Sequence, residues 1–264
     1  MALDLPPIDG INIDMSKPKT SEEGDEDEFD FEEIPFKADY LYTTKEEVKE
    51  LLRSGVKVLG TPAASLTWGI DGNRMIPVLE AGKEGEKQTA VTLDKLAQEI
   101  PEMFVFHSLS WPESQGDTDH IVVYGNTVIV IDSKRWKASR KYSITSGGAI
   151  MRGTVPFPQG KVKIGWALKT WRKKLPETKI IGVVTIAQEK VFVVRDKNWY
   201  RAPYSLVENE KLEAYLRELF TKHPASGQVS AKLLINLGLQ LVKARDRISE
   251  FIRVGGELRT NDLH

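Results

Sequence analysis

The stretch DHIVVYGNTVIVIDSK, residues 119–134, decides the predicted fold. Two runs of mostly β-branched residues flank Gly125 and Asn126, a dipeptide that favours a two-residue hairpin turn. If these two residues form the loop, Asp119 lies directly opposite Asp132 on the neighbouring strand. The stretch therefore predicts an antiparallel hairpin that places two carboxylates on one face of a sheet.

The two aligned acids mark a candidate metal site. Their Cβ atoms should lie roughly 5 Å apart, and like charges placed opposite one another destabilise a sheet. Such a pair is tolerated when a cation lies between the carboxylates, and these oxygen ligands suit Mg²⁺ or Mn²⁺. Lys134 follows Asp132 by two residues and shares its face, so we expect it to orient or activate a water, or to neutralise charge on a phosphate. The alternative is that both acids merely end their strands and that Lys134 forms a surface ion pair.

Glu86 is a third candidate ligand, because it lies in the first turn of a helix predicted over residues 83–100. The alternative is an ordinary first-turn acid that the helix dipole stabilises. Two nearby histidines, His107 and His120, are expected to be structural. Strand alternation points His120 away from Asp119, which argues against a role for it in the same site.

The remaining periodicities predict a mixed α/β domain. Apolar spacing and a capping box at residues 44–47 predict helices at about 44–53, 83–100, 158–175, 208–221 and 228–253. Runs rich in β-branched residues predict further strands at 103–109, 179–187 and 190–196. Between residues 83 and 221 the resulting order, α-β-β-β-α-β-β-α, favours a mixed β-sheet flanked by helices.

Charge divides the chain into two unlike parts. Residues 1–40 hold 13 acidic and 3 basic side chains, whereas residues 41–264 hold 25 acidic and 34 basic ones. The acidic side chains of residues 1–40 repel one another and the segment has little apolar surface to bury, which predicts a disordered arm. The basic remainder of the chain is suited to binding a polyanion. We divide the chain into an acidic flexible arm at 1–40, a lead-in with a short helix at 41–79, a core at 80–222 and a C-terminal helical extension at 223–264.

Composition excludes several kinds of site. The chain contains no cysteine, which excludes disulfides, Cys-ligated zinc and a thiol nucleophile. No apolar run approaches the ~18 residues needed to span a bilayer, and the first residues lack the pattern of a secretory signal. We expect a cytoplasmic protein, in the host cytoplasm if its source is a phage, without a membrane partner.

A basic track begins at the candidate site. From Ser133 to Pro176 the chain has twelve Lys or Arg residues and no Asp or Glu. Phosphates bind such a surface, so the track predicts an interface with DNA, although these residues do not distinguish DNA from RNA. Trp166 and Trp171 lie on the predicted helix and are expected in the core. The alternatives are a solvated basic face or a docking site for the acidic arm. The candidate contacts are Arg135, Trp136 as a stacking residue, Lys137, Arg140, Lys141, Lys161 and Lys163.

These features together resemble the nuclease-related domain, NERD, a branch of the PD-(D/E)xK restriction-endonuclease-like superfamily. The resemblance spans about residues 80–200, and its segments are specific in combination although each alone is weak. They are Gly82 to Glu86, Phe106 to Leu109, Asp119 to Val123, Val130 to Trp136, and Pro158 with Gln159. The resemblance implies the superfamily's mixed sheet flanked by helices, with Mg²⁺ or Mn²⁺ at the acids.

The resemblance also implies residue roles and a reaction. Asp119, Asp132 and Glu86 correspond to metal ligands, Lys134 to the catalytic lysine, and Gln159 to a later site residue. The chain departs from the family at Asp132, where Glu is common, and this change keeps the charge but shortens the reach. The implied function is metal-dependent hydrolysis of phosphodiester bonds in DNA.

A second function stays open on the sequence. An inactive nuclease fold could serve as a nucleic-acid-binding or assembly protein, for example as a structural component of a phage or mobile element. The acidic arm would then bind a protein partner, and the C-terminal helix would form a homo-oligomer. The alternative is that this helix packs on the core of its own chain. Its apolar stripe consists of Leu233, Leu234, Leu237, Leu241 and Ile248.

Overall fold

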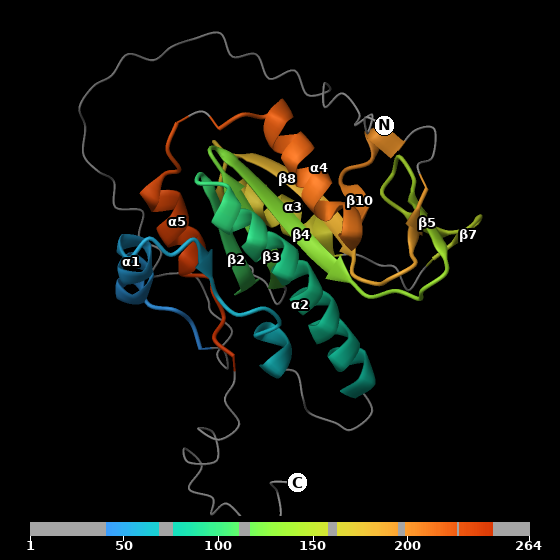
Figure 1. Cartoon of the computed structure of the whole chain (residues 1–264), viewed down its shortest axis with the longest axis horizontal. Coiled ribbons are helices and arrows are strands. Elements are labelled where there is room, and N and C mark those ends of the chain that lie inside the picture. Colours follow the sequence, from blue (N-terminus) through green and yellow to red (C-terminus); the bar gives the residue numbers. More distant parts are fainter. Residues whose placement is uncertain are drawn as a thin grey trace, which may run out of the picture.

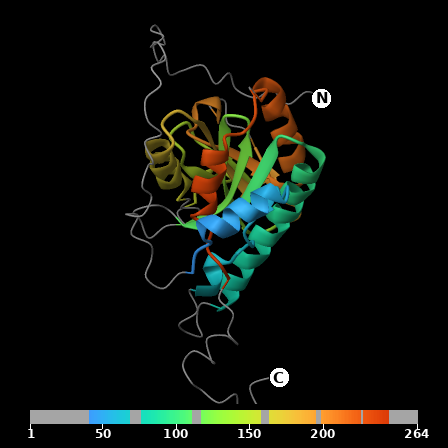
Figure 2. The ribbon, with the colours of Figure 1, turned by 90° about the vertical axis from the view of Figure 1, so that its left-hand side faces the viewer.

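The structure, a computed structural model, describes residues 41–68, 76–110, 117–157, 163–194, 199–225 and 227–244. Within these ranges the chain forms a six-stranded mixed sheet with helices on both faces (Figures 1 and 2). The predicted mixed α/β fold is therefore confirmed. The acidic arm, Gln159, Lys161 and Ile248 lie outside the described residues. None of the described helices is long and apolar enough to cross a membrane.

The central sheet has the strand order β1-β2-β3-β4-β8-β10. Strands β2, β3 and β4 are antiparallel neighbours, whereas β4, β8 and β10 run parallel to one another. The parallel step from β4 to β8 needs a crossover, and α3 (Ile164–Lys174) provides it. The strands are β1 (Val58–Leu59), β2 (Met103–Ser110), β3 (Asp117–Tyr124), β4 (Thr127–Lys134), β8 (Lys179–Ile186) and β10 (Ser205–Glu208).

Two apolar layers hold helices against the two faces of this sheet. Alternation along the strands serves both layers, because Val122 and Ile129 face one side while Ile121 and Val130 face the other. Figure 2 shows α2 and α4 on one side of the sheet and α3 on the other. The helices besides α3 are α1 (Lys45–Arg53), α2 (Ile76–Glu99), α4 (Asn209–Lys222) and α5 (Ala231–Gly238).

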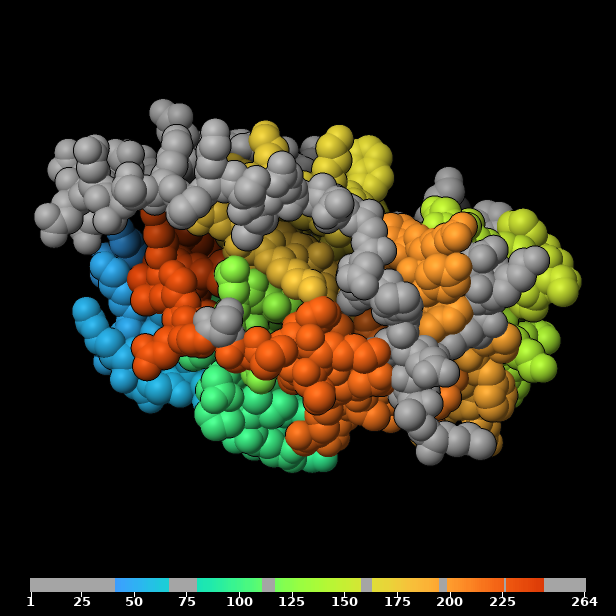
Figure 3. Space-filling view, turned by 90° about the horizontal axis from the view of Figure 1, so that it is seen from above, coloured from blue at the N-terminus to red at the C-terminus, as the bar shows by residue number. Residues whose placement is uncertain are grey.

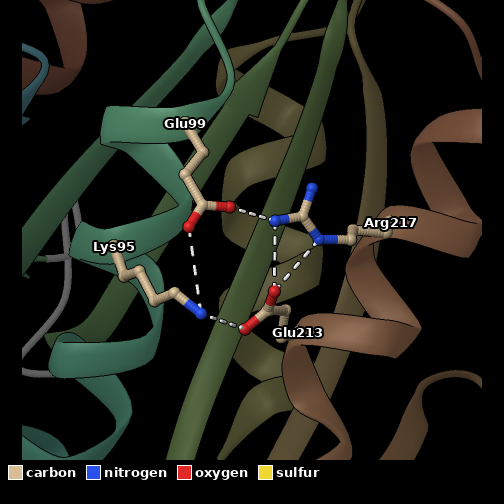
Figure 4. A network of polar contacts seen from close by, with 4 residues as sticks. All are labelled: Lys95, Glu99, Glu213 and Arg217. Atoms are coloured by element: carbon tan, nitrogen blue, oxygen red, sulfur yellow. Dashed lines mark hydrogen bonds and ion pairs between the residues drawn. The ribbon is translucent and has the colours of Figure 1, made fainter.

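Four charged side chains join α2 to α4 at the surface (Figure 4). Lys95 Nζ lies 3.0 Å from Glu213 Oε2 and 3.8 Å from Glu99 Oε1, and Arg217 pairs with both glutamates. Ion pairs this exposed to solvent contribute little to stability, because water and salt screen the charges. The apolar layer beneath them therefore supplies most of the stabilisation between the two helices.

Several predicted elements have different limits. Helix α2 begins at Ile76, before the predicted start at Lys83, and β9 covers only Phe192–Val193 of the strand predicted over 190–196. The helix predicted over 228–253 forms only in part, because α5 covers Ala231–Gly238 and ends there. After this glycine, a weak helix former, the chain turns and Leu241 bridges to β2. Tertiary pairing thus overrides a helical apolar pattern.

The predicted leucine stripe packs inside its own chain. Leu233, Leu234, Leu237 and Leu241 are buried in the core beneath β2. These four side chains are therefore not exposed to a second copy, and the assembly hypothesis loses the support it drew from them. Strand β1 and helix α5 also pack with the central sheet, so the residues on both sides of the predicted core form one packed body with it. The domain boundaries themselves stay a prediction.

A second, four-stranded sheet was not predicted from the sequence. Its order is β7-β6-β5-β9, and it lies at the opposite end of the molecule from α1 (Figure 1). Its strands are too short to show a clear period of two, which explains why the residues after Lys134 gave no strand signal. They are β5 (Lys141–Ile144), β6 (Ile150–Arg152), β7 (Val155–Pro156) and β9 (Phe192–Val193).

Candidate active site

The hairpin that carries the predicted acids forms in the predicted register. Pairing between β3 and β4 runs from Tyr124 with Thr127 to His120 with Ile131. The ladder ends one residue short of the expected pair of acids. Asp119 instead accepts a hydrogen bond on Oδ2 from the backbone N–H of Ser133, at 2.6 Å. The carboxylate thus replaces a ladder acceptor where β3 begins and β4 ends.

Lys134 and Asp132 form a close ion pair at the end of β4. The ammonium of Lys134 donates to Asp132 Oδ1 at 2.5 Å and to the carbonyl oxygen of Ser133 at 3.3 Å. Burial by itself lowers the pKa of Lys134, but the carboxylates of Asp132 and Asp119 outweigh it and raise the pKa above the usual lysine range. Lys134 therefore stays protonated. The second oxygen of Asp132, Oδ2, is buried and has no hydrogen-bond partner among the described residues.

Glu86 faces this pair from helix α2. The helix passes close to the chain that leaves β4, since a Cβ on Gly85 would lie 3.4 Å from the Cβ of Arg135. A Cβ at this position would make only ordinary van der Waals contact, so the approach does not require glycine. Glu86 is 4% exposed, and its Oε2 accepts a hydrogen bond from the backbone N–H of Ala63 at 3.1 Å. The structure thus brings the third predicted carboxylate to the same end of the sheet.

Two carboxyl groups of this cluster, Glu86 and Asp119, have raised pKa values. Burial raises the pKa of Glu86 to about 10, and the charges of Asp119 and Asp117 act in the same direction. Burial likewise raises the pKa of Asp119 to about 8, with Asp132 and Asp117 adding to the shift and Lys134 opposing it. Asp117 is an acid of this cluster that sequence reasoning missed. Buried carboxyls with raised pKa values are typical of functional sites.

Mg²⁺ or Mn²⁺ fits the donor chemistry of this cluster. Among the residues that the structure describes, no three His, Cys, Asp or Glu side chains form a group that could by itself hold a metal ion. Mg²⁺ usually binds only one or two carboxylates and completes its shell with water and substrate phosphates. Two observations match such an incomplete, oxygen-only ligand set. The Oδ2 atom of Asp132 is buried without a hydrogen-bond partner among the described residues, and Asp119 and Glu86 repel each other in the absence of a cation between them.

The loop at residues 60–66 supports Glu86, a role for which the sequence gave no signal. Ala63 takes a φ of 62°, which is uncommon for a residue with a Cβ. Ala64 donates its N–H to Ser108 Oγ at 2.9 Å, and that hydroxyl donates to the carbonyl oxygen of Thr61 at 2.9 Å. These bonds fix the loop on β2 and aim the Ala63 N–H at Glu86. The loop lacks any periodic pattern, so only the folded chain shows its use.

A buried chain of hydrogen bonds crosses the sheet behind the acids. His107 Nε2 lies 2.8 Å from Asp94 Oδ1, and the Nδ1 atoms of His107 and His120 lie 2.7 Å apart. His120 Nε2 then meets Ser133 Oγ at 3.1 Å, and Ser133 Oγ donates to Thr89 Oγ1 at 2.9 Å. Burial lowers the pKa of His120, so this ring stays neutral. His120 thus points away from Asp119, as strand alternation predicts.

Ser133→Ala tests how much this chain of hydrogen bonds stabilises the fold. The substitution removes the oxygen between His120 and Thr89 and leaves a buried ring nitrogen without a partner, which costs about 1–3 kcal/mol. Urea denaturation should show this loss in the free energy of unfolding. Ser143→Ala, at a half-buried position on β5, is the matched control and should change stability little. Equal losses in the two variants would contradict a special role for Ser133.

Most of the described nucleic-acid contacts predicted from the sequence lie between the end of β4 and β5, and Lys163 lies at the start of α3. Arg135 Nε donates to Gln188 Oε1 at 3.2 Å, and Lys163 is exposed where α3 begins. Trp136 is half-buried, and its ring packs 5.0 Å from that of Tyr142.

The expectation that both helix tryptophans lie in the core is wrong for one of them. Trp171 is 2% exposed, whereas Trp166 is 76% exposed.

Comparison with known proteins agrees with this geometry. Residues 81–187 match the family model described as the nuclease-related domain, NERD. The matched range contains Glu86, Asp119, Asp132 and Lys134, begins within α2 and ends directly after β8. No curated protein and no solved structure matches the chain. The family expected from the sequence is thus confirmed, and residues 81–187 of this chain are a nuclease-related domain.

Proposed function

We propose that this protein is a metal-dependent nuclease that hydrolyses phosphodiester bonds of DNA. The observation that supports the proposal most is that an ion pair, Lys134 with Asp132, lies beside two further carboxyl groups, the half-buried Asp119 and the buried Glu86. These four groups come from β3, β4 and α2 and meet within the nuclease-related domain. Such a cluster of hard oxygen ligands beside a cation suits hydrolysis of a charged phosphodiester.

Asp132, Asp119 and Glu86 would contribute ligands for Mg²⁺ or Mn²⁺, and water and substrate phosphate oxygens would complete the shell, because these side chains by themselves form no complete metal site. When bound, the ion would polarise a phosphoryl oxygen and lower the pKa of a water molecule. Lys134 keeps its proton because the neighbouring carboxylates raise its pKa, so it acts as a donor to the phosphate and not as a general base. Ser133 positions Asp119 through its backbone N–H, and Ala63 positions Glu86 in the same way.

Incubation of supercoiled and linear DNA with the protein tests the proposal directly. We expect cleavage with Mg²⁺ or Mn²⁺ and no cleavage with EDTA. Among the described residues of the carboxyl cluster Lys134 is the only cation, so a bound metal ion must supply the remaining positive charge. Asp132→Ala should abolish cleavage by removing the buried Oδ2. An RNA of the same sequence, assayed in parallel, distinguishes the two substrates. Equal cleavage by wild type and Asp132→Ala would contradict the proposed site.

A further inference from the structure

A hollow of about 510 Å³ on the second sheet carries four cations and no acid. The hollow shares no lining residue with the carboxyl cluster and lies within the acid-free part of the sequence, residues 133–176. Four like charges around one hollow repel one another, so an anion bound there would lower the electrostatic energy. The lining residues are Lys137, Ser139, Arg140, Lys141, Arg152 and Gly153.

An aromatic cluster fixes the platform from which these cations project. The guanidinium carbon of Arg152 lies 4.8 Å from the centre of the Phe157 ring. Tyr142 donates its hydroxyl to the carbonyl oxygen of Lys137 at 3.3 Å. Trp136 packs against both rings, with centroids 5.0 Å from Tyr142 and 5.3 Å from Phe157. Groups held in this way lose less conformational freedom when a ligand binds.

The hollow also lies within reach of the candidate active site. Lys137 follows Lys134 by three residues and Lys141 follows it by seven. An extended chain spans at most about 3.6 Å per residue, so their Cα atoms lie within about 11 Å and about 25 Å of that of Lys134. Phosphates of one strand follow at about 3.4 Å along a DNA helix. The hollow can therefore contact a phosphate no more than about seven nucleotides from one held at Lys134.

We propose that this hollow is a phosphate seat for the nucleic-acid backbone. It would hold a phosphodiester some nucleotides away from the reacting one and would contact no base, so it would bind without regard to sequence. This inference rests on the proposed nuclease function for its ligand. It assigns a role to Arg152 and to the second sheet, which lie outside the carboxyl cluster.

Binding of a fluorescently labelled DNA duplex to the full-length protein in EDTA tests the seat without cleavage. Each phosphate contact contributes a slope of about 0.9 to the dependence of log Kd on log salt concentration. Arg140→Gln with Arg152→Gln should therefore raise Kd about 8- to 60-fold at about 0.1 M salt and lower the slope by about 1 to 2. Lys137→Gln with Lys141→Gln should act alike, and it leaves the Arg152–Phe157 stack intact.

The matched control removes two cations from the far end of the molecule. Lys45→Gln with Lys49→Gln changes the net charge equally, and both residues lie on α1, opposite the second sheet in Figures 1 and 3. This variant should keep the wild-type slope. Equal effects of the control and hollow variants, or a wild type without DNA binding, would overturn the seat. An Asp/Glu-rich peptide serves as a second probe. If both double substitutions in the hollow weaken binding of this peptide as strongly as they weaken binding of DNA, the phosphate seat is overturned and the hollow binds an acidic polypeptide.

The two proposals fail separately in this design. Asp132→Ala should bind DNA at least as well as the wild type, because Asp132 lies outside the hollow. A wild type that binds through the hollow but never cleaves would refute the nuclease and leave the phosphate seat standing. A wild type that cleaves DNA while both hollow pairs bind like the control would refute the seat alone.

Discussion

Replacement of Lys134 by methionine is expected to lower the rate of DNA hydrolysis by about 10²–10³, the usual effect of removing one donor to a developing negative charge. Lys134 is the single cation that the structure places against the described carboxyl cluster, 2.5 Å from Asp132 Oδ1. Methionine keeps much of the side-chain volume and removes the charge. Single-turnover cleavage at saturating protein measures this rate apart from binding.

Two further variants separate charge from position. Lys134→Arg keeps the charge but places a larger, planar group beside Asp132, so it should recover only part of the rate. Lys45→Met removes an exposed cation of α1, outside the basic track, and should cleave like the wild type. An undiminished rate in Lys134→Met would show that the lysine serves only as a structural ion pair. DNA affinity in EDTA should stay close to wild type in the control variant, and Lys134→Met should weaken it by no more than one phosphate contact, about 8-fold at about 0.1 M salt.

Raising the pH in EDTA is expected to destabilise the folded protein through Glu86 and Asp119. Their ordinary pKa values are 4.5 and 3.8, and the folded values are raised to about 10 and about 8. Above pH 5 the unfolded chain has lost these protons while the folded chain keeps them. The stability they contribute is complete below the unfolded pKa and is lost as the pH rises through the folded pKa. Each group contributes a slope of up to about 1.4 kcal/mol per pH unit.

Glu86→Gln should remove its share of this slope, because the amide has no proton to lose in this range. Urea denaturation at several pH values, compared with the wild type, cancels the titration of all other groups. The variant should therefore gain stability over the wild type above neutral pH, and added Mg²⁺ should help the wild type more than the variant. Glu84→Gln, exposed on the same helix, is the control. Parallel pH–stability curves for wild type and Glu86→Gln would contradict the raised pKa.

Much of the fold followed from local patterns. The turn at residues 125–126 and the β-branched runs beside it set the register from Tyr124 with Thr127 to His120 with Ile131, as the structure has it. Short-range rules of this kind depend on sequence spacing alone, so they survive in any compact arrangement. The same spacing placed Lys134 beside Asp132 and turned His120 to the opposite face.

Other predictions failed where contacts distant in sequence decide the outcome. The C-terminal helix stops at Gly238 because the chain then pairs with β2, which no local pattern records. Trp166 is exposed although its neighbour on the helix, Trp171, is buried, because only one face of α3 meets the sheet. The second sheet escaped notice because its strands hold only two to four residues.

The sequence by itself determined the mixed α/β class, the family and the pairing of Lys134 with Asp132. These depend on alternation, turn chemistry and a spacing of two residues, all of which act over short stretches of chain. Only the tertiary structure decided how Glu86 joins that pair, through the close approach at Gly85 and the N–H of Ala63. It alone gathered Arg152 with Lys137, Arg140 and Lys141 around one hollow. Both arrangements join residues far apart in the chain, and the energy that holds them comes from packing and desolvation of the whole fold.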